Sequence, residues 1–176
     1  SLISLQCEGD CGLATGIVTK TAVTDATPAA NYAHIGTRDW ESDADLPPGA
    51  TVPDVAAQLV AAQQKYGIQV VLGGGRAPFM PRTLPDPEYP AQVGLRLDGR
   101  RLVDEWLAAR PGSRYVWNRQ QFDAVDPKTT RHLLGLFQPW HMHYEADRQP
   151  LDGSRSRDSA GEPSLAEMTA KSIDIL

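Results

Sequence analysis

Cysteine is scarce in this sequence, and its scarcity excludes two classes of protein. The 176 residues include two cysteines, Cys7 and Cys11, too few for a disulfide scaffold or for a zinc site made of four cysteines. The sequence does not decide whether Cys7 and Cys11 form a local disulfide or remain free thiols. Long apolar runs are absent as well, since no stretch approaches the about 18 to 20 residues that a membrane-spanning helix needs. We therefore predict no transmembrane segment, and at about 150 residues per domain the length fits one domain or part of a larger one.

Positive charge is in short supply too. Lysine and arginine number 17 against 22 aspartate and glutamate residues, which gives a net charge of −5. Proteins that bind nucleic acids or anionic membranes rely on a basic surface. We therefore predict that the chain does not bind nucleic acid.

Several familiar site motifs are also missing. There is no Gly-x-Ser-x-Gly turn and no pairing of cysteine with histidine. The segment of three glycines and an arginine, Gly73 to Arg76, lacks the Gly-Lys-Ser/Thr ending of a phosphate loop. Pro78 also prevents an ordinary helix from following it, so a tight turn after a strand is the favoured interpretation. His141 and His143 could hold a metal on one face of a strand. With no further ligand nearby in the sequence, surface histidines are the favoured interpretation.

Short β-rich segments alternate with helical patterns along the chain. This alternation predicts an α/β layer architecture with a largely parallel central sheet flanked by helices. Ser164 and Glu167 form a capping-box pattern at the start of the last predicted helix. Five prolines between Pro78 and Pro90 predict a long surface excursion. The predicted strands are residues 13–19, 67–72, 115–117 and 133–137, and the predicted helices are residues 28–36, 51–64, 100–109 and 164–176.

The densest group of polar residues, Thr24 to Thr27, follows the first predicted strand. Ligands of open α/β sheets bind outside the carboxyl ends of the strands. In an extended segment Asp25 and Thr27 would point the same way, and their carboxylate and hydroxyl oxygens suit Mg²⁺. The spacing alone favours another interpretation, in which both residues cap a helix that starts at Pro28.

Arg38 could bind an anionic substrate through its planar guanidinium group. A straight helix from Thr27 would carry it about 16 Å away at about 1.5 Å per residue. A site shared with Asp25 therefore needs the chain to turn back. Taken alone, Arg38 is expected to form a surface ion pair with Asp39, Asp43 or Asp45.

A series of segments, in the same order along nearly the whole chain, resembles the alkaline phosphatase family. They correspond to the middle of a family member, which is more than twice as long. The segments are LATGIVT (residues 13–19), TDATPAA (24–30), YAH (32–34), RDWESDAD (38–45), VLGGGR (71–76), PDPEYP (85–90), YVWNR (115–119), HLLGLF (132–137) and PSLAEM (163–168).

This resemblance implies an alkaline-phosphatase-like layered fold and the hydrolysis of phosphate monoesters, with two Zn²⁺ ions, one Mg²⁺ ion and a serine that becomes transiently phosphorylated. By the same resemblance Asp25 and Thr27 are Mg²⁺ ligands and Arg38 binds the substrate phosphate, which reverses the interpretation from spacing. A guanidinium group can bind two phosphoryl oxygens and stabilise transition-state charge. A periplasmic or secreted location and a homodimeric parent are also implied.

The resemblance also implies a calcium site, typical of the animal enzymes. Glu88, the carbonyl of Phe137 and Asp152 match calcium ligands. Gln138 stands where that pattern has glutamate, and the loss of one carboxylate should weaken the site. Asp25, in contrast, matches the bacterial pattern, because the animal enzymes carry histidine there.

We expect the chain to be a fragment. In the resemblance, the nucleophilic serine and the zinc ligands lie outside these residues, so we predict that the isolated chain is inactive while its parent is a phosphomonoesterase. Residues 1–176 would be the central part of one domain, with residues 77–97 and 138–162 as surface excursions. The alternative is a non-catalytic short protein or module that binds divalent metal or phosphate.

Overall fold

The computed structural model describes residues 13–148 and 160–176, so Cys7, Cys11 and Asp152 lie outside the described residues. Four strands form one sheet in the order β1-β2-β4-β3, and every pair is parallel. This confirms the predicted α/β architecture, with strand boundaries shifted by a few residues. The strands are β1 (Gly16–Ala22), β2 (Val70–Gly74), β3 (Ser113–Val116) and β4 (His132–Leu136).

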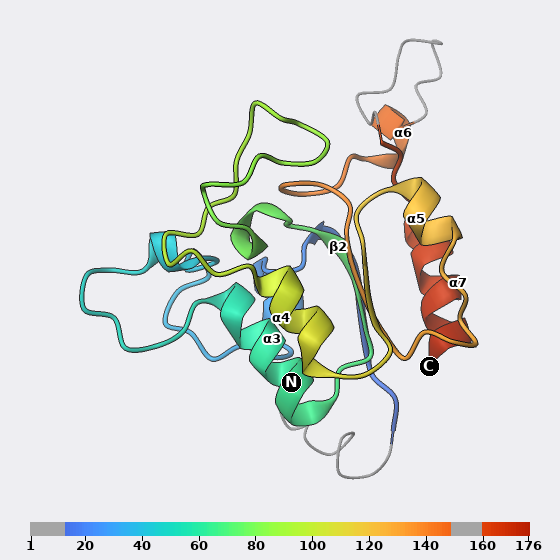
Figure 1. Ribbon diagram of the computed structural model, residues 1–176, viewed down its shortest axis with the longest axis horizontal. Coiled ribbons are helices and arrows are strands. Elements are labelled where there is room, and N and C mark those ends of the chain that lie inside the picture. The colour runs from blue at the N-terminus through green and yellow to red at the C-terminus, as the bar shows by residue number, and fades with distance from the viewer. Residues whose placement is uncertain (1–12, 149–159) are drawn as a thin grey trace.

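Helices cover both faces of this sheet (Figure 1): α3 (Val55–Tyr66) and α4 (Leu102–Ala109) on one face, and α5 (Arg119–Asp123) and α7 (Leu165–Ile175) on the other. Successive side chains of a strand point to opposite faces. Accordingly Val71 of β2 belongs to the core under α3 and α4, whereas Val70 and Leu72 belong to the core under α5 and α7. The central strands are therefore buried on both sides, which explains their continuous apolar sequence.

Capping residues fix the ends of the longer helices. Asp54 accepts a hydrogen bond from the backbone N–H of Ala57 at the start of α3, and Gly67 ends that helix with φ +78°. The capping box predicted for α7 is present, with Ser164 and Glu167 each bonded to the backbone of the other. Within the described residues no helix is long and apolar enough to cross a membrane. The shorter helical turns are α2 (Ala26–Ala29), α6 (Glu145–Arg148) and the 3₁₀ turns Asp43–Asp45 and Ala77–Phe79.

The helix predicted over residues 28–36 is wrong after its first turn. Helix α2 ends at Ala29, and the chain then folds back toward β1. The hydroxyl of buried Tyr32 donates to the carbonyl of Val23 at 2.8 Å. The backbone N–H and carbonyl of His34 both bond to the side chain of Gln58. These tertiary contacts outweigh the helical pattern of the segment.

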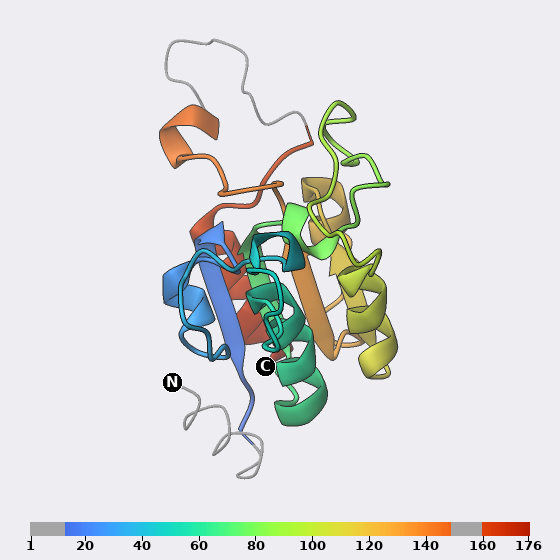
Figure 2. The same ribbon diagram turned by 90° about the vertical axis from the view of Figure 1, so that its left-hand side faces the viewer.

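Two buried arginines hold the segment that follows β2. Arg76 donates from Nε and Nη2 to the two carboxylate oxygens of Asp86, at 2.7 and 2.8 Å. Arg96 donates to both oxygens of Asp54 at 3.1 Å and also contacts Asp98. Burial alone would raise the pKa of Asp86, but the hydrogen bonds and charge of Arg76 outweigh it and lower that pKa. Figure 2 shows this green segment rising above the edge where β1 also ends.

Candidate functional site

The candidate site begins where β1 and β2 end side by side. The backbone N–H of Val23, just after β1, donates to the carbonyl of Gly74 at 3.0 Å. Thr24 is fully buried, and Asp25 is only partly covered. Asp25 therefore lies at the carboxyl edge of a parallel sheet, where open α/β folds bind their ligands.

Asp25 caps α2, which confirms half of the interpretation from spacing; the cap predicted at Thr27 and the helix start predicted at Pro28 are wrong, because α2 begins at Ala26. Its carboxylate oxygen Oδ1 accepts a hydrogen bond from the backbone N–H of Ala26 at 2.7 Å. Thr27 lies inside the four-residue helix and is exposed, so the expected extended segment is absent and the alternation argument does not apply. The cap orients the carboxylate at the start of the helix, of which Thr27 is the second residue.

The structure brings Arg38 back to Asp25. Arg38 Nη2 donates to Asp25 Oδ1, although the two residues would lie far apart on a continuous helix. The chain turns back, as a site shared by these two residues requires, because α2 ends at Ala29. Neither Asp39, Asp43 nor Asp45 is the partner: Arg38 forms its ion pair with Asp25. The Arg38 side chain is 62% exposed, so its guanidinium group remains open to an external anion.

Glu41 is a further member of this group, and the sequence reasoning missed it. The hydroxyl of Thr24 donates to Glu41 Oε2. Burial raises the pKa of Glu41; the Thr24 hydrogen bond opposes this rise, the carboxylates of Asp25 and Asp45 add to it, and His141 opposes it. The available signal was a carboxylate three residues after Arg38 within the RDWESDAD segment. Glu41 adds carboxyl oxygens close to Asp25 and so enriches the site in hard donors.

The predicted tight turn is wrong for most of the glycine run, because Gly73 and Gly74 are the last residues of β2 and Gly75 follows with φ +90°. The backbone N–H groups of Gly75 and Arg76 donate to the carbonyl of Gln138 at 3.0 and 2.9 Å, so they are already occupied. A Cβ atom on Gly74 would lie 2.0 Å from the carbonyl oxygen of Trp140. The glycines therefore allow the segment after β4 to pack directly against the end of β2.

The candidate calcium residues are only partly assembled. Glu88 has a side chain that is 2% exposed; its Oε2 lies 3.5 Å from Arg76 Nη2, and its Oε1 accepts from the backbone N–H of Ala160 at 3.1 Å. Phe137 directly follows β4 and is buried. Calcium takes about six to eight oxygen ligands, whereas the described candidates offer one carboxylate that already faces a cation. A calcium site here would therefore need further oxygen ligands from outside the described residues, such as the proposed Asp152.

The two histidines after β4 have separate partners. His141 Nδ1 accepts from the backbone N–H of Ala22 at 2.8 Å. His143 Nδ1 lies 2.7 Å from Glu162 Oε1, and the Glu162 side chain is fully buried. Over residues 13–148 and 160–176, no three or more histidine, cysteine, aspartate or glutamate side chains gather as a metal centre would require. Both rings are therefore held by hydrogen bonds, and His143 is held by a buried carboxylate.

Comparisons with known proteins bear on this arrangement. The family model described as alkaline phosphatase matches residues 5–176. The tissue-nonspecific alkaline phosphatase of Felis catus is 42% identical over 176 residues, covering 95% of this chain and 32% of that protein. The chain thus spans about a third of the length of the curated relatives it matches.

Solved structures show the same fold. A cold-active alkaline phosphatase from the psychrophile Shewanella sp. superposes with a TM-score of 0.62 at 23% identity, covering 98% of this chain and 31% of that chain. The Thermus thermophilus alkaline phosphatase superposes with a TM-score of 0.60 at 28% identity, covering 96% of this chain and 27% of that chain. A mutant alkaline phosphatase from TAB5, described with Mg bound in its M3 site, superposes with a TM-score of 0.51 at 16% identity. The match covers 81% of this chain and 32% of that chain.

Proposed function

The chain belongs to the alkaline phosphatase family, and on this premise we propose that it is the central part of a metal-dependent phosphomonoesterase. In this proposal Arg38 binds the phosphate of the substrate, and Asp25 and Thr27 are ligands of Mg²⁺. The observation that carries the proposal is the contact between Arg38 and Asp25 at the carboxyl edge of the sheet. The substrates would be phosphate monoesters, and inorganic phosphate would be the product.

Arg38 has the exposure and the chemistry for this role. An exposed ion pair adds little to stability, so the guanidinium group can exchange its contact with Asp25 for two oxygens of a bound phosphoryl group. Its planar fork matches that geometry, and its fixed charge stabilises the negative charge on the phosphoryl oxygens in the transition state. Helix α2 and the return of the chain hold Asp25 and Arg38 in this relation before substrate arrives.

The donor set at Asp25 and Thr27 fits Mg²⁺. A carboxylate and a hydroxyl are the hard oxygen ligands that Mg²⁺ takes together with water, and the hydrogen bond from Ala26 fixes the orientation of the carboxylate. When bound, Mg²⁺ supplies positive charge beside the reacting phosphate. From the family resemblance, the proposal assigns the two Zn²⁺ sites and the nucleophilic serine to other parts of the parent enzyme.

Three further proposals rest on the family alone: a periplasmic or secreted location, a homodimeric parent, and a calcium site at Glu88, the Phe137 carbonyl and Asp152. The burial of Glu88 and the position of Phe137 directly after β4 support the calcium site. The residues 77–97 and 138–162 remain proposed surface excursions of one domain.

Phosphate release from p-nitrophenyl phosphate, with and without a chelator, tests the proposal. The full-length parent should hydrolyse the ester only when metal is present, and Arg38→Ala should remove most of this activity. Arg82→Ala, at an exposed arginine outside the site, is the matched control and should leave it unchanged. Metal-dependent hydrolysis by the 176-residue chain alone, abolished by Arg38→Ala, would contradict the assignment of the nucleophile to another part of the parent. An inactive parent, together with micromolar binding of Mg²⁺ or phosphate by this chain, would favour the non-catalytic module.

A further inference from the structure

Asp43 connects the segment that carries Arg38 to a distant part of the chain. That segment leads from α2 to α3, and Asp43 begins its 3₁₀ turn. The carboxylate oxygen Oδ2 of Asp43 accepts hydrogen bonds from the backbone N–H groups of Leu97 and Asp98, at 3.0 and 2.8 Å. These donors lie 54 and 55 positions later in the sequence, just before α4. The turn after Arg38 is therefore fixed by a tertiary contact.

Arg96 lies at the centre of this contact, and its side chain is fully buried. Its guanidinium group donates to both oxygens of Asp54 at 3.1 Å and also contacts Asp98. Its Nη2 lies 3.7 Å from Oδ1 of Asp43. The three carboxylates belong to the turn after Arg38, the start of α3 and the segment before α4. Because the donors of a guanidinium group have a fixed planar geometry, Arg96 holds these three segments in one arrangement.

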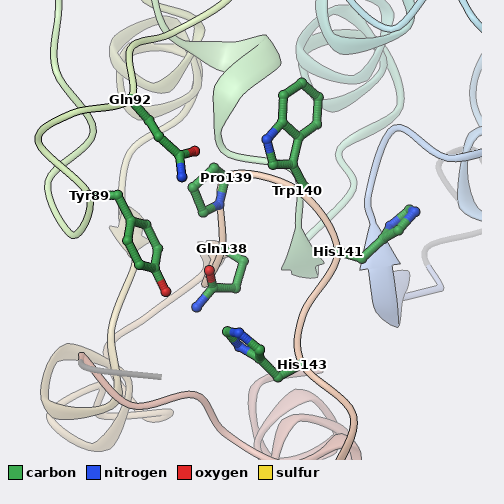
Figure 3. A pocket seen from close by; sticks show the side chains of 7 residues that line it. All are labelled: Tyr89, Gln92, Gln138, Pro139, Trp140, His141 and His143. Atoms are coloured by element: carbon green, nitrogen blue, oxygen red, sulfur yellow. The ribbon is translucent and has the colours of Figure 1, made fainter. Parts of the chain in front are cut away.

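Glu41 provides a second attachment, three positions after Arg38. Its backbone carbonyl accepts from the N–H of Ala56 at 3.1 Å, and its carboxylate accepts from the hydroxyl of Thr24. The ring of His141 points toward the end of β1 (Figure 3) and opposes the rise in the pKa of Glu41. The backbone between Arg38 and the 3₁₀ turn is thus held against both α3 and the end of β1.

The Arg38 side chain itself is held far less firmly. It is 62% exposed, and its ion pair with Asp25 is of the exposed kind that contributes little. Its place relative to a substrate therefore depends on the backbone that presents it. A displacement of about 1 Å in a positioning group can cost about 10²-fold in rate, so the attachments of this backbone bear on phosphate binding.

We propose that Asp43 is a positioning residue of the phosphate site, which fixes the backbone that presents Arg38 to the substrate and is itself held by Arg96. This inference rests on the proposed function, since it takes Arg38 as the residue that binds phosphate. Asp43 does not touch the substrate in this account. Its loss should weaken the binding of the phosphate group, both in an ester and as the inorganic ion.

The test is steady-state kinetics of the full-length parent with p-nitrophenyl phosphate, with inorganic phosphate as the competitive inhibitor. Asp43→Ala should raise KM and the inhibition constant of phosphate about three- to thirtyfold, because Arg38 is displaced but still present. Asp43→Asn should restore most of the binding, since one amide oxygen can accept from both N–H groups. Asp104→Ala, at an exposed ion pair with Arg101, is the matched control and should leave both constants unchanged.

This readout separates positioning from a loss of folded protein. Partial unfolding lowers kcat per mole of enzyme and leaves KM and the inhibition constant unchanged, whereas a displaced Arg38 raises both constants. Arg96 keeps its contacts with Asp54 and Asp98 in the Asp43 variants, so we expect unchanged circular dichroism. In an Arg38→Ala background, Asp43→Ala should raise KM no further.

Three results would overturn the inference while Arg38→Ala still impairs phosphate binding. They are an Asp43→Ala variant with the KM of the Asp104→Ala control, an Asp43→Asn variant as impaired as Asp43→Ala, and a further rise in KM when Asp43→Ala is added to Arg38→Ala. An Arg38→Ala variant with unchanged KM and an unchanged inhibition constant would instead overturn the proposed function, and this inference with it.

Discussion

The guanidinium group of Arg38 and the carboxylate of Asp25 are in direct contact, although 13 positions separate them in the sequence. The short helix α2 makes this contact possible, because it ends at Ala29 and lets the chain return to the end of β1. The same carboxylate oxygen that Arg38 contacts also caps α2. One aspartate therefore serves as a helix cap and as a candidate metal ligand, so the two interpretations of the sequence are compatible.

Arg76→Met should destabilise the fold strongly. The side chains of Asp86 and Glu88 are 4% and 2% exposed, and removal of their cation leaves two carboxylates buried together. Breaking a buried ion pair from one side costs about 3–5 kcal/mol of unfolding free energy. Urea unfolding followed by circular dichroism measures this difference.

Two further variants control this experiment. Arg101→Met removes an exposed pair with Asp104, with side chains 59% and 52% exposed, and should change stability by no more than about 0.5 kcal/mol. Adding Asp86→Asn and Glu88→Gln to Arg76→Met should recover part of the loss. Equal stability of Arg76→Met and Arg101→Met would show that the ion pair does not anchor the segment after β2.

Gly74→Ala should disrupt the packing of the segment after β4. The new Cβ would lie 2.0 Å from the Trp140 carbonyl oxygen and 3.1 Å from the Met142 backbone nitrogen, so the backbone must move. Overpacking of this kind costs about 1–3 kcal/mol. Gly36→Ala is the matched control, since its Cβ would meet only the Trp40 ring at 3.7 Å. Thermal melts that show Gly74→Ala and Gly36→Ala to be equally stable would contradict the close approach of Gly74 to the Trp140 carbonyl.

The capping box of α7 predicts a pH dependence of stability. The hydrogen bond from the backbone of Ser164 and the contact with Arg119 lower the pKa of Glu167 from 4.5 to about 2. Because this pKa is depressed in the folded state, the stabilisation is complete above pH 4.5 and is lost as the pH falls toward about 2. The Glu167→Gln variant has no carboxyl group to titrate at this position. The difference in unfolding free energy between it and the unaltered protein should therefore shrink as the pH falls over that range. A difference that stays constant with pH would rule out this role for the carboxylate.

The sheet could be predicted from the sequence, because buried parallel strands require continuous apolar runs such as residues 70–72 and 133–134. The local cap at Asp25 could be predicted as well, since it depends on neighbouring residues alone. The end of α2 at Ala29 could not, because the contacts of Tyr32 and His34 that turn the chain back involve distant residues.

Buried charge was the other feature that sequence patterns missed. Arg76 and Arg96 are almost fully buried, whereas arginine is ordinarily a surface residue. Asp98 is the one partner close in sequence, two positions from Arg96. Asp86 lies 10 positions from Arg76, and Asp54 lies 42 positions from Arg96. Glu41 was missed for the same reason, since its contact with Thr24 crosses 17 positions.

A double-mutant cycle on Asp25 and Arg38 in the full-length parent tests most directly whether they belong to one catalytic site. We predict that Arg38→Lys lowers kcat/KM for p-nitrophenyl phosphate by about 10²–10³, the loss expected for one charge-stabilising donor, and that Asp25→Asn also lowers it. In the double variant the loss should be clearly smaller than the product of the two single losses, because residues in contact are coupled. Single variants with unchanged kcat/KM, or losses that multiply as for independent sites, would contradict the account.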